Sequence, residues 1–359
     1  MGENEDVLVT VDRGFGLIRL NRPRAINSLT PAMVSAISQA LTKWEHDDDV
    51  SAVVLSGEGE RGLCAGGDIV DVVYKSALGD HSVATSFWWD EYLMNAQIAG
   101  YPKPFVSLMD GIVMGGGVGV SAHGSVRVVT DTTKMAMPEV GIGFIPDAGG
   151  TYILSRAPGL LGLHAALTGA PFAAGDAIAM GFADRYVPHD QLGDFSDAIV
   201  ADGIDAALDS YATEPPPSEL LAQQQWIDDC YAGDTVEDIV AALRGHDSGP
   251  APGGTGGTAA VDAANLIMTR SPVSLSVALE AVRRAAKLDT LKDVLRQEYR
   301  TTCQSLNSHD LVEGIRAQVI DKDRNPKWSP PSLAEVTRAD IDAYFAPRNP
   351  DLTFPEETQ

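Results

Sequence analysis

Apolar and polar positions near the start of the chain predict two strands followed by a helix. Residues 7–11 and 16–20 are short strand-forming runs, and the turn Asp12-Arg13-Gly14 between them is typical of a hairpin. Thr30-Pro31 has the form of a helix start, because Thr is a good N-cap and Pro fits the first helical position. Apolar side chains then recur at helical spacing, at Met33, Ile37, Ala40, Leu41 and Trp44.

Further apolar runs predict buried strands that alternate with helices. Residues 52–56 form such a run, which ends at a glycine, and residues 105–108 form another. Parallel strands alternating with helices are typical of an α/β architecture in which both faces of the sheet are covered.

The character of the chain changes after residue 212. Glu214-Pro215-Pro216-Pro217 interrupts it, and residues 246–258 (HDSGPAPGGTGGT) have the composition of a flexible connector. Residues 274–286 and 291–306 then show helical periodicity. We expect residues 1–212 to form the core with the active site, and residues 213–359 a helical C-terminal extension.

Composition and charge exclude several classes of protein. Of 359 residues, 44% are hydrophobic and 21% charged, so the chain can bury a core and is neither disordered nor collagen-like. Fifty acidic against 26 basic residues give a net charge of -24. That charge repels nucleic acid unless a local basic patch is present, so we expect no nucleic-acid partner.

The cysteines and the N-terminus indicate a compartment. Cys64, Cys230 and Cys303 are odd in number and far apart, which predicts neither a disulfide framework nor a zinc site. The sequence MGENEDVLVTVD lacks the features of a signal peptide, and no run of about 20 apolar residues suits a membrane helix. We expect a cytoplasmic protein without metal or membrane partner.

Glycines cluster where strands are predicted to end. Segments 57–67, 111–124 and 141–150 are rich in glycine, and α/β folds place ligands at such loops. Tight turns alone could explain any single glycine. The first two segments could also each present free backbone N–H groups to an anion, and two such donors aimed at one point form an oxyanion hole.

A dinucleotide-binding site is a rival interpretation of the same glycines. Gly117, Gly119 and Ala122 match the loose fingerprint, with Asp131 as the ribose acid. That fold needs a crossover helix of about ten residues before its next strand, and the segment before residue 126 is too short for one.

Two carboxylates lie eight residues apart in an otherwise apolar segment. Burial would raise the pKa of Glu139 or Asp147, which suits basic or nucleophilic work near neutral pH. Pro146-Asp147 also has the form of a helix start, and the helix dipole would favour an ionised Asp147. The alternatives are that Asp147 is a plain helix cap and that Glu139 pairs with an arginine.

Several of these segments resemble one known family. CAGGDI, GIVMGGGVG and MPEVGIGFIPDAGGTY, beginning at residues 64, 111 and 137, resemble the crotonase (enoyl-CoA hydratase/isomerase) superfamily and, within it, the 3-hydroxyisobutyryl-CoA hydrolases. The similarity extends to NRPRAIN at 21–27, EYR at 298–300 and HDLVEGIRA at 309–317. The resemblance implies an α/β crotonase-like fold, a spiral of repeated ββα units with a helical C-terminal region.

The resemblance also implies a set of site residues. The backbone N–H groups of Gly67 and Gly116 would form the oxyanion hole. Glu139 and Asp147 would be catalytic, and Glu91, Gly116, Glu139 and Asp147 would contact the substrate. Glu139 would attack the carbonyl or activate a water, and Asp147 would orient the 3-hydroxyl group or protonate the leaving thiolate.

Two further positions bear on the ligand and the reaction. Arg24 is the best candidate to bind the CoA phosphates, within an expected basic patch that also includes Arg22, Arg61 and Lys103. Gly119 stands where enoyl-CoA hydratases carry a second catalytic glutamate, which weakens the hydratase interpretation.

The activity implied by the resemblance is hydrolysis of short-chain 3-hydroxyacyl-CoA thioesters. The best-fitting substrate is 3-hydroxyisobutyryl-CoA, an intermediate of valine breakdown, and no cofactor is implied because CoA is part of the substrate. The alternatives are an enoyl-CoA hydratase or isomerase, and a non-catalytic acyl-CoA-binding protein. Family members often form trimers or hexamers, so a homo-oligomer is also considered.

Overall fold

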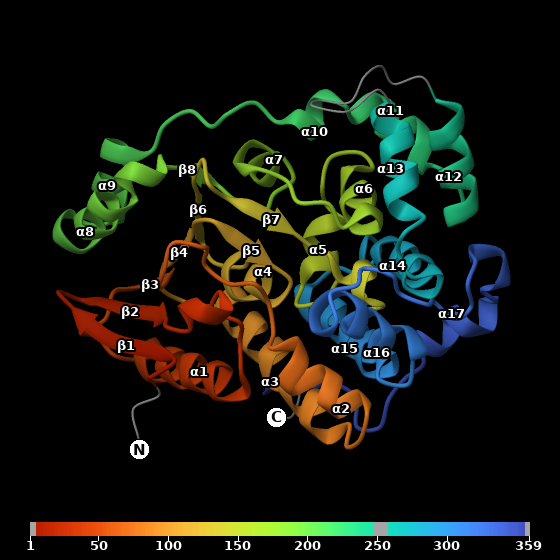
Figure 1. Cartoon of the computed structure of the whole chain (residues 1–359). Coiled ribbons are helices and arrows are strands. Elements are labelled where there is room, and N and C mark those ends of the chain that lie inside the picture. The colour runs from red at the N-terminus through yellow and green to blue at the C-terminus, as the bar shows by residue number, and fades with distance from the viewer. Residues whose placement is uncertain (1–4, 247–257, 356–359) are drawn as a thin grey trace. The chain divides into compact units, whose positions relative to one another are not determined.

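The computed structural model describes residues 5–246 and 258–355 (Figure 1). The chain divides into two compact units. The first unit consists of Met1–Asp68, Trp89–Ala136 and Phe172–Ser218, and the second of Ile69–Trp88, Met137–Pro171 and Glu219–Gln359. Each unit therefore brings together segments that are far apart in the sequence. The linear boundary at residue 212 is a different kind of division and stays a prediction. Most of the expected connector, residues 247–257, lies outside the described residues.

A six-stranded sheet is the centre of the first unit. Its order is β1 (Val7–Asp12), β2 (Phe15–Leu20), β3 (Ala52–Gly57), β4 (Phe105–Met109), β6 (Val126–Val129) and β8 (Arg185–Tyr186). β1 and β2 pair antiparallel, and the other neighbours pair parallel. A second parallel pair is formed by β5 (Ile112–Met114) and β7 (Lys134–Ala136). The predicted hairpin and both predicted buried strands are confirmed.

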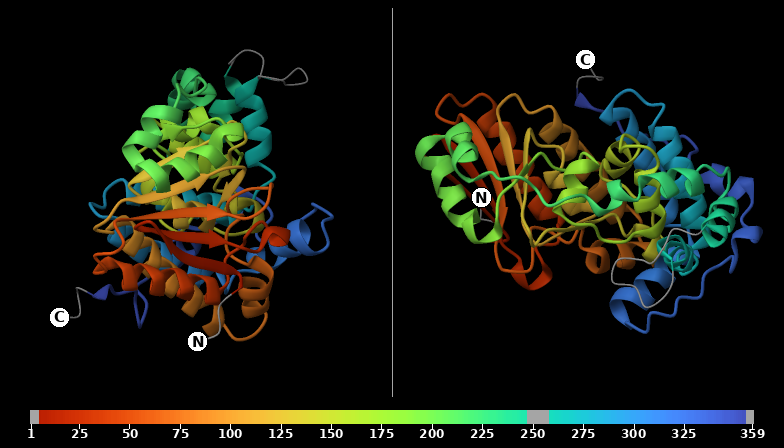
Figure 2. Two further views of the ribbon diagram at one scale, coloured as in Figure 1. Left: turned by 90° about the vertical axis from the view of Figure 1, so that its left-hand side faces the viewer. Right: turned by 90° about the horizontal axis from the view of Figure 1, so that it is seen from above.

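Helices cover both faces of this sheet (Figures 1 and 2). α1 (Pro31–Glu45) packs against β1 and β2, and a Cβ at Gly16 would lie only 2.5 Å from the Trp44 ring. On the other face, apolar side chains of α8 (Leu192–Asp202) and α9 (Ile204–Tyr211) pack on strand residues such as Val54. The sequence prediction of α1 is confirmed, including its cap, because Thr30 Oγ1 accepts a hydrogen bond from the N–H of Met33.

The second unit is helical in its described residues. Its longer helices are α6 (Leu161–Thr168), α11 (Gln224–Tyr231), α12 (Val236–Gly245), α13 (Ala259–Ile267), α14 (Pro272–Ala285), α15 (Leu291–Ser305), α16 (His309–Ile315) and α17 (Arg338–Tyr344), and its shorter turns include η3 (Glu139–Ile142), α5 (Gly150–Leu154) and η5 (Arg316–Ile320). α14 and α15 confirm the helices predicted from periodicity. No helix among the described residues is both long and apolar enough to cross a membrane.

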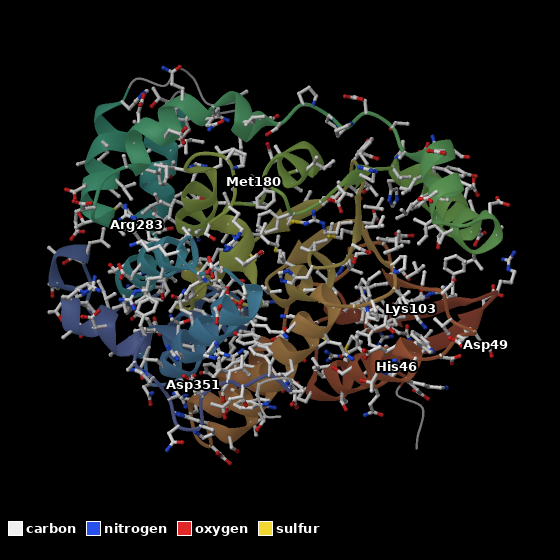
Figure 3. The ribbon with its side chains drawn as sticks, turned by 180° about the vertical axis from the view of Figure 1, so that it is seen from behind. His46, Asp49, Lys103, Met180, Arg283 and Asp351 are labelled. Atoms are coloured by element: carbon white, nitrogen blue, oxygen red, sulfur yellow. The ribbon has the colours of Figure 1, made fainter. Side chains whose placement is uncertain are left out.

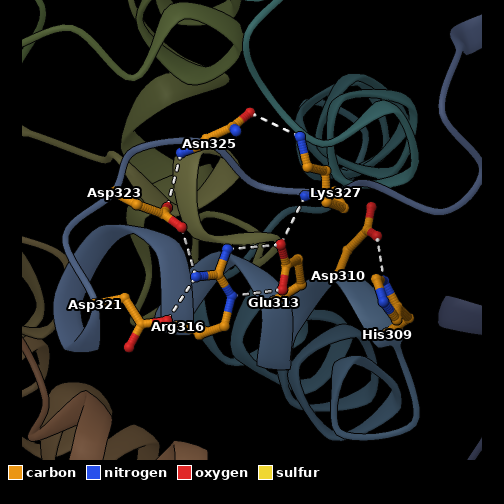
Figure 4. Close-up of polar contacts among 8 residues, drawn as sticks. All are labelled: His309, Asp310, Glu313, Arg316, Asp321, Asp323, Asn325 and Lys327. Carbon is orange, nitrogen blue, oxygen red and sulfur yellow. Dashed lines mark hydrogen bonds and ion pairs between the residues drawn. The ribbon is translucent and has the colours of Figure 1, made fainter.

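An ion-pair cluster fixes the turn that follows α16 (Figure 4). Arg316 Nη1 donates to Asp321 and Asp323, both at 2.7 Å, while its Nε and Nη2 donate to Glu313. The backbone N–H of Lys327 also donates to Glu313, at 2.7 Å. The cluster therefore ties the segment after η5 back to α16.

Asn27 anchors the first glycine-rich loop of the first unit. It is fully buried in the left-handed conformation (φ +52°), and its Nδ2 donates to the carbonyls of Glu58, Gly62 and Leu63 at 3.0–3.2 Å. Its Oδ1 accepts from the N–H of Arg22 at 2.8 Å. One side chain thus holds together the segment at 21–27 and the loop that leads to Gly67.

We expect Asn27→Asp to destabilise the protein by about 3 kcal/mol or more, because a carboxylate would face three carbonyl oxygens with no proton to donate. Urea unfolding measures this free energy. Asn21→Asp is the matched control, since the Asn21 side chain donates to one exposed carbonyl, that of Glu5. Equal losses in the two variants would contradict the assignment.

Candidate active site

Two free backbone N–H groups meet in the first unit. Gly67 ends the loop that follows β3, and Gly116 begins α4 (Gly116–Ser121), where Gly115 takes a positive φ of +51°. The amide nitrogen of Gly67 lies 3.3 Å from the place that a Cβ of Gly116 would occupy. Within the described part of the chain, neither amide donates a hydrogen bond. The structure thus brings together the two donors expected from the sequence, while their role as an oxyanion hole stays a prediction.

Glu91 lies directly beside this pair. It belongs to α3 (Ser82–Ala99), is buried, and places Oε1 2.4 Å from the Cβ position of Gly116. Any side chain at residue 116 would collide with this carboxyl group, which explains the glycine. Gly67, Gly116 and Glu91 therefore form one cluster within the first unit.

Asn95 is a buried polar residue that sequence reasoning missed. It is fully buried one helical turn after Glu91, and neither Oδ1 nor Nδ2 has a hydrogen-bond partner among the described residues. A buried amide in this state normally bonds to a water or a ligand group. Its i, i+4 spacing from Glu91 was the signal available in the sequence.

Cys64 is close in sequence to Gly67, but its thiol is unreactive. Its thiol is fully buried, and burial raises its pKa to about 12. It donates to the carbonyl of Asn27 at 3.2 Å. Because the thiolate is the reactive form, Cys64 acts as a packing residue.

Glu139 begins η3 in the second unit and is almost fully buried. Its Oε2 atom has no hydrogen-bond partner among the described residues. Burial, and after it the charge of Asp147, raise the pKa of Glu139 well above its usual 4.5. Among the described residues no arginine forms an ion pair with Glu139, so the structural alternative of an arginine partner is not realised there.

The backbone of α16 supports η3 through two glycines. Gly143, which ends η3 with φ +71°, lies so close to α16 that a Cβ would reach the carbonyl carbon of Asp310 at 2.2 Å. A Cβ at Gly314 would lie 2.3 Å from the carbonyl of Ile142. The C-terminal segment that carries part of the family resemblance thus packs backbone to backbone against the turn that holds Glu139.

The expected helix start at Pro146-Asp147 is wrong by three residues. α5 begins at Gly150, and Gly149 is its N-cap. The first N–H groups of the turn are taken by Glu298 of α15, because Glu298 accepts from the N–H of Gly149 at 2.7 Å and from that of Thr151 at 3.0 Å. The cap is therefore a side chain distant in sequence, which a local pattern cannot reveal.

Glu298 is a further site residue whose role the sequence did not show. It is fully buried, and burial raises its pKa to about 8 despite three hydrogen bonds that lower it. The charge of Asp147 raises the pKa of Glu298 as well as that of Glu139. Three interacting carboxyl groups, Glu139, Asp147 and Glu298, therefore lie together within the second unit.

The expected basic patch is small. Arg24 is exposed, and Arg61 Nη2 donates to its carbonyl at 3.3 Å. Arg22 is instead paired with Asp68 at 3.1 Å. Lys103 donates to the carbonyl of Asp47 at the far end of α1, where Figure 3 shows it near His46 and Asp49. Because a helix of 15 residues is about 22 Å long, Lys103 lies far from Thr30 at the start of α1, whereas Arg61 contacts Arg24.

The chain belongs to the enoyl-CoA hydratase/isomerase family, whose model matches residues 15–345. It is 38% identical to a 3-hydroxyisobutyryl-CoA hydrolase of Xenopus laevis, named mitochondrial, over 92% of this chain and 86% of the relative. The human protein of that name is 36% identical, over 95% of this chain and 88% of the relative. 3-Hydroxyisobutyryl-CoA hydrolase 1 of Arabidopsis thaliana is 35% identical, over 99% and 96%.

Solved structures confirm the predicted crotonase fold but carry other names. A carnitinyl-CoA dehydratase from Mycobacterium thermoresistibile is 66% identical with a TM-score of 0.93, covering 98% of this chain and 99% of that one. An enoyl-CoA hydratase from Rhodobacter sphaeroides is 40% identical with a TM-score of 0.88, covering 97% and 100%. The comparisons therefore agree on the family, but the relatives and the solved structures are named for different reactions.

Glu139→Gln should stabilise the protein, and more so as the pH rises. Folded Glu139 keeps its proton at pH values where the unfolded chain, with a pKa near 4.5, has lost it. Wild-type stability therefore falls as the pH rises above that value, and a glutamine removes this loss. We expect a higher melting temperature than wild type at about pH 8 and a similar one near pH 4.

The exposed Glu335→Gln is the control and should change neither melting temperature. A Glu139→Gln variant that is less stable than wild type at about pH 8 would contradict the raised pKa.

Proposed function

We propose that this protein hydrolyses short-chain 3-hydroxyacyl-CoA thioesters and that its best substrate is 3-hydroxyisobutyryl-CoA, within valine breakdown. The observation that carries the proposal is the buried Glu139, whose Oε2 is unpartnered among the described residues and whose pKa is raised. Relatives named for this hydrolysis, 35–38% identical over at least 92% of the chain, support the choice of substrate.

In the proposed reaction, the thioester oxygen binds the N–H groups of Gly67 and Gly116. These donors stabilise the negative charge that develops on the oxygen, and one such donor contributes roughly 100-fold to 1,000-fold to the rate. The ionised Glu139 either attacks the carbonyl carbon, forming an anhydride that water then opens, or removes a proton from an attacking water. Either route breaks the C–S bond and yields one hydroxy acid and one CoA thiol for each water consumed.

Asp147 has two proposed roles, orienting the 3-hydroxyl group or protonating the leaving thiolate. Its charge raises the pKa of Glu139, so Glu139 becomes a stronger base once it has lost its proton. The rate of thiol release should therefore rise with pH as Glu139 ionises.

An enoyl-CoA hydratase or isomerase is the second candidate. The solved structure from Rhodobacter sphaeroides is named an enoyl-CoA hydratase, and the one from Mycobacterium thermoresistibile is named a dehydratase. Position 119 argues against this candidate. Gly119 is buried inside α4 and supplies no carboxylate where family hydratases carry their second glutamate. A non-catalytic acyl-CoA-binding protein is the third candidate.

We further propose that catalysis needs no cofactor beyond the CoA of the substrate and that Arg24 contacts a CoA phosphate. We also propose that the protein is located in the cytoplasm. All three cysteines are free, as a reducing compartment requires, whereas the animal relatives are named mitochondrial. A trimer or hexamer is proposed from the family alone and is measurable by light scattering.

The decisive assay gives the purified protein 3-hydroxyisobutyryl-CoA and crotonyl-CoA separately and follows free thiol and the double bond in parallel. We expect rapid thiol release from the first ester and little change in the double bond of the second. Glu139→Gln should slow thiol release by about 100-fold or more, since it cannot act as base or nucleophile. Asp147→Asn should also slow it.

Asp176→Asn is the matched control, because Asp176 is a buried carboxylate of the first unit that accepts from Ser218 Oγ. Its thiol release should match wild type. Rapid hydration of crotonyl-CoA without thiol release would favour the hydratase, and activity unchanged in Glu139→Gln would favour the binding protein.

A further inference from the structure

Glu298 reaches from α15 into the turn that follows Asp147. Its Oε2 accepts a hydrogen bond from the N–H of Gly149 at 2.7 Å. Its Oε1 accepts two, from the N–H of Thr151 at 3.0 Å and from Thr151 Oγ1 at 2.6 Å. One carboxyl group thus satisfies the amides that a helix start leaves without intrahelical partners.

The turn held in this way is strained. Ala148 and Gly149 both take positive φ values, +53° and +79°, immediately after Asp147. The left-handed conformation is unfavourable for an alanine, and such a turn persists only when its surroundings hold it. The three hydrogen bonds that Glu298 accepts hold this turn, at residues two and four positions after Asp147.

Capping a short helix with the buried carboxyl group of Glu298 has a free-energy cost. It is 1% exposed, and burial raises its pKa to about 8. An apolar residue would avoid the cost of burying a carboxyl group, but it would leave the N–H groups of Gly149 and Thr151 buried without acceptors. A carboxyl group at this position is therefore explained by a need to keep the turn after Asp147, and with it the Asp147 side chain, in one geometry.

We propose that Glu298 is a positioning residue for thioester hydrolysis: its three hydrogen bonds to Gly149 and Thr151 hold the strained turn and so fix the Asp147 carboxyl group for the reaction. The inference rests on the proposed hydrolase function. It adds a residue 149 positions away from the turn that it controls.

Glu298→Gln separates the hydrogen bonds from the bulk of the side chain. Both oxygens of Glu298 face donors, so an amide N–H would oppose a donor in either orientation of the glutamine. Thr151→Val removes only the hydroxyl donor and keeps the shape of the side chain. Thr151→Ser restores the hydroxyl and serves as the conservative rescue.

We expect Glu298→Gln to lower kcat for thiol release by about 100-fold with KM little changed, because a displacement near 1 Å costs about that factor. Thr151→Val should lower kcat less, and Thr151→Ser should recover it. Hydrogen–deuterium exchange of the peptide covering residues 147–154 should become faster in Glu298→Gln and in Thr151→Val.

Gln297→Leu is the folding control. Gln297 is buried next to Glu298 on α15, and its Nε2 donates to the carbonyl of Ala281. It should lower the melting temperature while leaving kcat and exchange of residues 147–154 as in wild type. A Glu298→Gln variant with wild-type kcat, or with kcat lowered only as far as Gln297→Leu lowers it, would overturn the proposal.

The exchange measurement separates this inference from the proposed function. If wild type released no thiol from 3-hydroxyisobutyryl-CoA, the hydrolase proposal would fail, while faster exchange in Glu298→Gln would still support the anchoring of the turn. Wild-type thiol release together with unchanged exchange in Glu298→Gln would overturn the anchoring and leave the hydrolase proposal intact.

Discussion

The burial of three carboxyl groups around one turn is the constraint on which the second unit depends. Glu139, Asp147 and Glu298 are each at least 94% buried, so their charges are poorly solvated and interact strongly. Burial and the charge of Asp147 raise the pKa of Glu139, and Glu298 accepts hydrogen bonds from the backbone that follows Asp147. Buried carboxyl groups with a raised pKa lower the stability of a fold, and they are common at active sites.

In the first unit, the candidate site is formed mainly by backbone N–H groups at glycines. The backbone N–H groups of Gly67 and Gly116 lie side by side, and the collision that a Cβ of residue 116 would make with Glu91 shows how closely the chain segments approach. Asn27 holds the preceding loop through three carbonyls. Preorganised N–H groups of this kind need no rearrangement during a reaction, which is why they stabilise developing charge effectively.

Local patterns predicted the parts of the fold that local physics determines. The hairpin, α1 with its Thr30 cap, the buried strands and helices α14 and α15 all followed from periodicity and turn residues. Gly67, Gly116, Glu91, Glu139 and Asp147 were predicted as site residues from motifs and family resemblance. Glu298 was not given a role, because its partners Gly149 and Thr151 are almost 150 residues away, and Asn95 was missed because a buried amide in a helix looks like any other polar residue.

The position of a labelled oxygen tests the central claim most directly. The protein is incubated with 3-hydroxyisobutyryl-CoA in ¹⁸O-water, and both the acid and the remaining ester are examined by mass spectrometry. Hydrolysis predicts free CoA and a 3-hydroxyisobutyrate that carries ¹⁸O in its carboxyl group. Label in the 3-hydroxyl group of an intact CoA ester would show reversible dehydration instead and would contradict the assignment as a thioester hydrolase.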